Sequence, residues 1–258
     1  MAEPRVFNVA IPVIPERSGG GAWIGIAWMV VTGLMFVCVT GIVHYVGSAV
    51  PAAEAAFIRY GFGVALILPF LIRGLRHPIS LATLGVFSLR GLAHALGVIL
   101  WFYAMANIPM AEVTAIGYTS PIYITIGAAV FFGEKLAMRR IFAVVAGFVG
   151  AMIIIRPGFH EVSSGQLAQL LSAPMFAISY LIAKRLTVNA SPAVVVGMLS
   201  IFVTICLMPF AYAVWQVPSL ADTAWLALVA VFATLGHFTM TKALHAAPLT
   251  VTQPVTFL

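Results

Sequence analysis

The sequence predicts an all-α protein that crosses a membrane many times and is built from two related halves. Of its 258 residues, 62% are hydrophobic and 8% are charged, whereas a soluble domain carries roughly 25% charged residues. The apolar residues form runs of about 20, which is the length that an α-helix needs to cross the hydrocarbon core. Strands of a membrane barrel would be about 10 residues long and alternate in polarity, so these runs indicate helices.

The apolar runs predict eight helices and the beginning of a ninth. Residues 1–21 contain Glu3, Glu16 and three prolines and have no continuous apolar core. They therefore predict a disordered cytoplasmic tail rather than a signal peptide. The two cysteines, Cys38 and Cys206, lie inside apolar runs and indicate neither a metal site nor a disulfide framework. The expected helices span 22–44, 52–72, 82–107, 111–132, 137–155, 164–186, 191–213 and 222–246, and the ninth begins near 249.

The Lys and Arg residues indicate which ends of the helices face the cytoplasm. With the N-terminus inside, ten of them lie in cytoplasmic segments and one, Arg156, lies outside, while Arg59 and Arg90 lie within helices. Such a bias toward the cytoplasm is typical of membrane proteins. It explains the net charge of +6 without nucleic acid as a partner. The ten are Arg5, Arg17, Arg73, Arg76, Lys135, Arg139, Arg140, Lys184, Arg185 and Lys242.

A weak internal repeat recurs at an offset of about 140 residues. A repeat unit of five helices is odd, so the second copy enters the membrane in the opposite orientation, as in many secondary transporters. This predicts an inverted repeat over 22–158 and 164–258, with the substrate site near the midplane between the halves. The matching segments are 34–36 with 174–176, 68–70 with 208–210, and 103–109 with 242–248.

The same offset predicts that the chain is a fragment. Leu258 aligns with Thr119, so residues 120–158 have no counterparts in the second half. We therefore expect the chain to stop within its ninth helix and the native gene product to be about 35–45 residues longer.

Several motifs together resemble a known family. They are Glu54 through Arg59, 108–112, 131–136, Arg139-Arg140 and 155–158. In their order and spacing they look like the EamA domain of the drug/metabolite transporter superfamily, over residues 22–258. The resemblance implies ten helices in two EamA units and transport of a small metabolite across the bacterial inner membrane. Members include amino-acid exporters and uptake proteins for vitamins or S-adenosylmethionine.

The inverted repeat, the polar stripes on several helices and the lack of a soluble domain support a secondary transporter that works by alternating access. We expect no cofactor and no metal, and a homodimer is one option for the small-residue face described below. One alternative is a partner subunit or lipid-headgroup flippase of the same superfamily, which usually resembles one repeat rather than two. A more remote alternative is an intramembrane enzyme, but the chain has no HExxH and no GxSxG. His94, His237 and Glu112 are candidates to converge, yet their predicted depths in the membrane differ.

Arginine within a membrane helix is costly and normally faces a cavity or a partner. Arg59 therefore predicts either a contact to an anionic solute or a structural anchor. In the third helix Arg90, His94, Gly97 and Trp101 form a stripe at helical spacing, which suits an aromatic or zwitterionic solute. The alternative is that Arg90 extends to the inner interface and Trp101 packs at the outer one.

The fourth helix presents Thr114, Tyr118, Pro121 and Thr125 on one face. Pro121 cannot donate a backbone hydrogen bond and leaves the carbonyl of Gly117 without its usual donor. Tyr118 is the first candidate for a cavity residue, and the alternative is hydrogen bonding between helices.

Two further stripes complete the candidate site. The eighth helix carries Thr234, His237, Thr241 and His245, and the first carries Thr32, Phe36, Thr40 and His44. Packing is the alternative role for each histidine. Small residues at 143, 147 and 151 predict a scaffold or dimer face. Because Glu54, Glu112 and Glu134 all look peripheral, the sequence favours facilitated diffusion or exchange over proton coupling.

Overall fold

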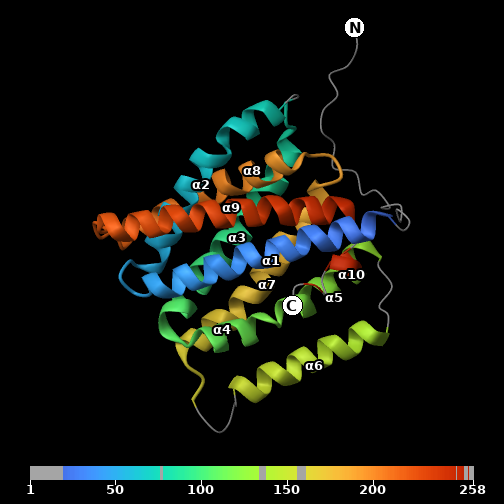
Figure 1. Cartoon of the computed structure of the whole chain (residues 1–258), viewed down its shortest axis with the longest axis horizontal. Coiled ribbons are helices and arrows are strands. Elements are labelled where there is room, and N and C mark those ends of the chain that lie inside the picture. Colours follow the sequence, from blue (N-terminus) through green and yellow to red (C-terminus); the bar gives the residue numbers. More distant parts are fainter. Residues whose placement is uncertain are drawn as a thin grey trace.

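The apolar segments fold as helices joined by short connections (Figure 1). The computed structural model describes residues 20–75, 78–133, 138–155, 161–247, 249–252 and 255, and these contain helices but no strand. Seven stretches of the described residues are long and apolar enough to cross a membrane. This confirms the predicted all-α polytopic membrane fold. The helices are α1 (Gly20–Val46), α2 (Ala52–Gly74), α3 (Leu81–Asn107), α4 (Met110–Gly117), α5 (Ser120–Phe132), α6 (Met138–Ile155), α7 (Ser164–Leu186), α8 (Pro192–Ala213), α9 (Leu220–Ala246) and α10 (Leu249–Thr252).

The spanning segment predicted over 111–132 is present as Met110–Phe132, but a break divides it into α4 and α5. Pro121 lies in the first turn of α5 and has no N–H to continue the helix from α4. Thr119 closes the break: its backbone N–H and its hydroxyl both donate to the carbonyl of Ile116, at 3.0 and 2.7 Å. Helix α1 begins at Gly20, slightly before the predicted end of the tail, and residues 1–19 lie outside the described part of the chain.

Serine residues fix where three of the long helices begin. The hydroxyls of Ser80, Ser163 and Ser219 precede α3, α7 and α9 and accept hydrogen bonds from backbone N–H groups in the first turn. Such caps satisfy donors that have no partner within the helix. At the other end of α5, Gly133 adopts a φ of 66°, a left-handed conformation that favours glycine and ends the helix.

The contacts between helices occur in matching pairs. Helix α1 packs along α9, α3 packs along α7, and α2 packs along α8 between them. Helix α2 also contacts α9, as α8 contacts α3. Exchanging α1, α2 and α3 with α7, α8 and α9 leaves this pattern unchanged. Helix α6 packs on α4 and α5 at the edge of the bundle (Figure 1).

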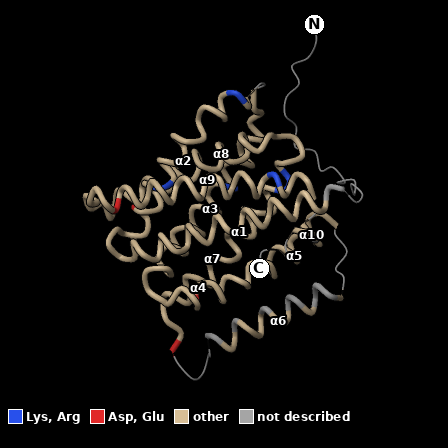
Figure 2. The backbone as a smooth tube through the Cα atoms, in the orientation of Figure 1, with Lys and Arg blue, Asp and Glu red and all other residues tan. Residues whose placement is uncertain are grey.

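Acidic and basic residues separate along the helices. Among the described residues, Figure 2 shows Asp and Glu toward the side where α9 begins, and Lys and Arg from the interior toward the opposite side. The acidic ones at helix starts are Glu54, Glu112 and Asp222, and the basic ones at helix ends are Arg73, Lys184 and Arg185. The two ends of the bundle therefore carry opposite charge.

Buried Lys184 joins the end of α7 to the end of α9. Its ammonium group donates to the carbonyl oxygens of Leu244 and Ala247, the latter at 2.8 Å, and its side chain is only 5% exposed. Carbonyls at a helix C-terminus lack donors within the helix and carry partial negative charge, so a cation stabilises them.

Replacing Lys184 is therefore expected to destabilise the protein. We expect Lys184→Met to lower the melting temperature of the purified protein by about 5–10 °C, because charge-assisted hydrogen bonds contribute about 1.5–3 kcal/mol each. The control is Lys242→Met, which removes a half-buried ammonium group 4.5 Å from the ring of Trp28 and should cost about 0.5–1 kcal/mol. Equal melting temperatures for the two variants would contradict the role of Lys184.

Candidate functional site

Two arginines, two histidines and a tyrosine meet inside the bundle, and we call them the central cluster. Helix α2 contributes Arg59 and Tyr60, α3 contributes Arg90 and His94, and α9 contributes His237. All five side chains are buried, none being more than 7% exposed. Polar groups within a membrane protein are costly unless they pair with one another or face a solute.

Short contacts link the members of the central cluster across three helices. The rings of His94 and His237 lie 5.2 Å apart, centre to centre, and the rings of Tyr60 and His94 lie 6.0 Å apart. The guanidinium carbon of Arg59 lies 3.8 Å from the centre of the Tyr60 ring, which is a cation–π geometry. Nδ1 of His94 is hydrogen-bonded to the hydroxyl of Ser179 on α7 at 3.0 Å.

Aromatic rings from the two flanking helices complete the surroundings. Phe36 of α1 stands edge-on to His237 at 5.2 Å, and Phe176 of α7 stands edge-on to His94 at 5.1 Å. Gly97 lets α7 approach this region closely, because a Cβ at Gly97 would lie 3.1 Å from the ring of Phe176. The cluster therefore combines basic side chains with a lining of aromatic rings.

Hydrogen-bonding capacity is left over inside the cluster. Nη1 of Arg90 donates to the carbonyl of Val195 on α8 at 2.8 Å, while Nε of Arg90 is buried without a partner. Nδ1 of His237 is likewise buried without a partner. An unsatisfied buried polar group costs about 1–3 kcal/mol, so a solute that pairs with these atoms would recover that cost.

Three of the described carboxylates, those of Glu54, Glu112 and Asp222, each accept a hydrogen bond from a group outside the cluster. Glu54 accepts a hydrogen bond from the backbone of Gln216 at 2.9 Å, and Glu112 accepts one from the side chain of Gln166 at 2.9 Å. Asp222 accepts one from Ser219 in the cap of α9. The central cluster therefore suits a solute with an anionic group or several hydrogen-bond acceptors, and it disfavours a cation.

The structure brings four of the predicted site residues together in the central cluster, and the others are not members of it. Arg59, Arg90, His94 and His237 lie in the central cluster. Trp101 lies farther along α3 and stands edge-on to Phe102 at 5.4 Å. The hydroxyls of Thr241 and Thr40 donate to carbonyls one turn earlier in their own helices, those of His237 at 2.7 Å and Phe36 at 2.8 Å.

Three candidates of the fourth predicted helix lie apart from the cluster. Thr114 is exposed and its hydroxyl donates to the carbonyl of Met110 at 2.9 Å, and Tyr118 is 36% exposed beside the break. Pro121 is half-buried in the first turn of α5. Contact of these residues with a solute stays a prediction. Glu134, and the side chains predicted to form a small-residue face at 143, 147 and 151, lie outside the described residues.

Sequence reasoning missed the meeting of His94 with His237, for which it predicted different depths. A count of residues from the start of each helix predicts that two side chains lie at the same depth in the membrane only if the two helices run parallel. It also missed Tyr60, Phe176 and Ser179, which no polar stripe had marked. Glu112 does not join the two histidines, and the described residues contain no group of three or more His, Cys, Asp or Glu that could hold a metal ion.

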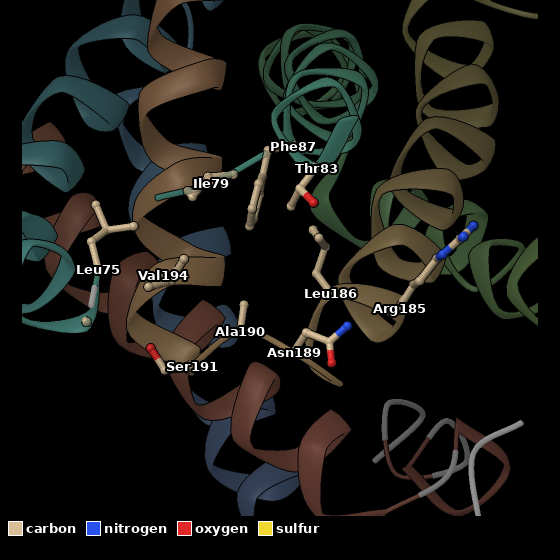
Figure 3. A pocket seen from close by; sticks show the side chains of 11 residues that line it. Leu75, Ile79, Thr83, Phe87, Arg185, Leu186, Asn189, Ala190, Ser191 and Val194 are labelled. Carbon is tan, nitrogen blue, oxygen red and sulfur yellow. The ribbon is translucent and has the colours of Figure 1, made fainter. Parts of the chain in front are cut away.

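A small pocket lies next to the cluster, at the ends of α2 and α7 that carry basic residues (Figure 3). Phe87, Leu186 and Val194 form its apolar wall, and Asn189 adds a polar group. Phe87 lies one turn from Arg90 on α3. Val194 is the neighbour of Val195, whose carbonyl accepts the hydrogen bond from Arg90. The pocket and the cluster are thus separated by about one helical turn.

Comparison with known proteins places this fold. Residues 23–156 match the EamA-like transporter family. The chain is 33% identical to a riboflavin transporter of Rhizobium johnstonii over 255 residues, 96% of this chain and 82% of the relative. It is 30% identical to a riboflavin transporter of Vibrio cholerae serotype O1 over 236 residues, 89% and 79% of the two chains.

A relative of lower identity is also a transporter, and a solved structure has the same fold. The chain is 26% identical to an S-adenosylmethionine uptake transporter of Rickettsia bellii over 235 residues, 91% of this chain and 81% of the relative. A solved protein crystal structure superposes with a TM-score of 0.64 at 17% identity, over 92% of this chain and 83% of that one, and so shares its fold. The chain belongs to the EamA-like transporter family and is a multi-pass membrane protein that transports a small metabolite.

Proposed function

We propose that this protein transports riboflavin, or a solute with a similar planar ring system, and binds it at the central cluster. The observation that carries this proposal is a buried site with two arginines, two histidines and flanking aromatic rings, while Glu54 and Glu112 hydrogen-bond to groups outside it. The flavin ring of riboflavin is uncharged and carries carbonyl oxygens and ring nitrogens that accept hydrogen bonds. Its faces stack on aromatic side chains.

The charge of the site favours riboflavin over S-adenosylmethionine, which other relatives are named for transporting. S-adenosylmethionine carries a sulfonium and an ammonium cation against one carboxylate, so its net positive charge would lie beside Arg59 and Arg90 in a water-poor interior. Repulsion between like charges is strong at short distance in such surroundings. The unpaired Nε of Arg90 is a fixed donor and suits a carbonyl or ring nitrogen instead.

We further propose that transport proceeds by alternating access between two inverted repeats, 22–158 and 164–258, with no chemical change to the solute. The paired helix contacts support this division, because α2 and α8 meet at its centre. The separation of charge along the helices supports a cytoplasmic N-terminus in the bacterial inner membrane. The pocket beside Asn189 then lies on the cytoplasmic side. A homodimer contact through the predicted face on α6 remains part of the proposal.

Uptake into vesicles tests the substrate. Liposomes that contain the purified protein should accumulate labelled riboflavin with saturation, and excess unlabelled riboflavin should abolish the signal. An equal excess of S-adenosylmethionine should leave it unchanged, because the cluster is basic. Liposomes without protein give the background. Saturable uptake of S-adenosylmethionine without uptake of riboflavin would overturn the proposal.

A further inference from the structure

Glu54 makes a contact that transport of riboflavin does not explain. It lies in the first turn of α2 and is fully buried, with 0% of its side chain exposed. Its Oε2 accepts a hydrogen bond from the backbone N–H of Gln216, at 2.9 Å, in the connection between α8 and α9. Beside this bond, Phe57 and Trp215 stand edge-on at 6.2 Å. The start of α2 is therefore tied to the far end of α8 by one polar and one aromatic contact.

The same place in the other half of the molecule is built differently. Helices α2 and α8 begin at Ala52 and Pro192, so Glu54 corresponds to Val194. Val194 lines the pocket at the opposite end of the bundle, together with Ala190 from the connection that precedes α8. One end thus has a pocket at this position, whereas the equivalent position at the other end is occupied by the contact of Glu54 with Gln216.

We propose that the hydrogen bond between Glu54 and Gln216 is a latch that holds the end away from the pocket closed. This rests on the alternating access proposed above. In that scheme the structure is the state closed at the acidic end, and opening that end separates the start of α2 from the connection between α8 and α9. A single hydrogen bond to a carboxylate suits a latch because it is strong enough to favour one state and can still be broken.

The second carboxylate oxygen keeps this latch from being a permanent bond. Oε1 of Glu54 is buried and has no hydrogen-bond partner. Burying it costs free energy in the closed state, and exposure to water would recover that cost when the end opens. The two oxygens of Glu54 therefore act in opposite directions, and the closed state is favoured only by their difference.

Two substitutions remove the latch in independent ways. Glu54→Ala removes the acceptor, and Gln216→Pro removes the donor because proline has no backbone N–H. Gln216→Ala is the matched control, since it changes the same residue and keeps the N–H. Glu112→Gln is a second control at the same end of the molecule, where Glu112 accepts a hydrogen bond of the same length, 2.9 Å, from Gln166.

The accessibility of single cysteines to a thiol reagent reports which end of the protein is open. In a background with Cys38 and Cys206 changed to serine, Ala56→Cys places a thiol at a fully buried position near Glu54, and Ala190→Cys places one at the pocket. Each is labelled with a membrane-impermeant maleimide in vesicles of both orientations. We expect both latch variants to label about tenfold faster at position 56 and more slowly at position 190, and both controls to label as the parent.

The possible results test the latch independently of the proposed substrate. Unchanged labelling in a folded Glu54→Ala protein overturns the latch, even if riboflavin is transported normally. The same holds if Gln216→Ala changes labelling as much as Gln216→Pro, because the backbone N–H would then be irrelevant. A shift in labelling in a protein that does not take up riboflavin supports the latch and rejects only the proposed substrate.

Discussion

Arg90→Leu is expected to lower riboflavin uptake by about 100-fold without unfolding the protein. Arg90 is 1% exposed, binds the carbonyl of Val195 through Nη1 and keeps its Nε unpaired. In the proposed complex, Nε donates to an acceptor on the solute. Leucine removes this charged donor, and the loss of such a bond in a dry site corresponds to roughly 3 kcal/mol. Initial uptake rates at a fixed riboflavin concentration measure the effect.

Arg90→Lys and Arg73→Leu make this prediction specific. Lysine keeps the charge but offers a compact ammonium group instead of a planar fork, so it should restore only part of the activity. Arg73 is an exposed residue in the last turn of α2, and Arg73→Leu should stay within about twofold of the parent, because an exposed charge contributes little. Near-normal uptake by a folded Arg90→Leu protein would remove the central cluster as the binding site.

The helices were predictable because the bilayer imposes a length and a composition on each one. The break at Thr119 was predictable only in part: Pro121 indicated a lost backbone hydrogen bond, but proline occurs both within membrane helices and at their starts. At the break, the hydroxyl and the backbone N–H of Thr119 both donate to the carbonyl of Ile116.

The central cluster was predictable in part, for a related physical reason. Arginine is costly in a membrane, so Arg59 and Arg90 indicated a functional or paired position by themselves. Tyr60 and Phe176 did not, because an aromatic residue is an ordinary packing residue of a membrane helix. Their role depends on which helices cross beside them, and that is a property of tertiary contacts. Tyr118 was singled out by the sequence but lies outside the cluster, because a polar stripe on a helix does not specify which neighbouring helix it faces.

Gly91→Ala is expected to prevent normal assembly of the bundle, although it adds a single methyl group. A Cβ at Gly91 would collide with Cβ of Phe202 and lie 3.2 and 3.3 Å from the backbone carbon atoms of the same residue on α8. Carbon atoms in contact are normally about 3.5–4.0 Å apart. Because the obstacle is the backbone and Cβ of Phe202, no change of rotamer relieves it, and α3 must move away from α8.

That movement would also strain the neighbouring bond between Arg90 and Val195, which joins the same two helices. Overpacking of this kind costs about 3 kcal/mol or more, so we expect a low yield of monodisperse protein and a clearly reduced melting temperature. Gly85→Ala is the matched control in α3, because a Cβ at Gly85 would have nothing within 4 Å, and alanine favours a helix over glycine by about 1 kcal/mol. Phe202→Ala should not rescue Gly91→Ala, since it keeps the clashing Cβ. Rescue by Phe202→Ala, or a normal melting temperature for Gly91→Ala alone, would show that α3 and α8 do not meet at this glycine.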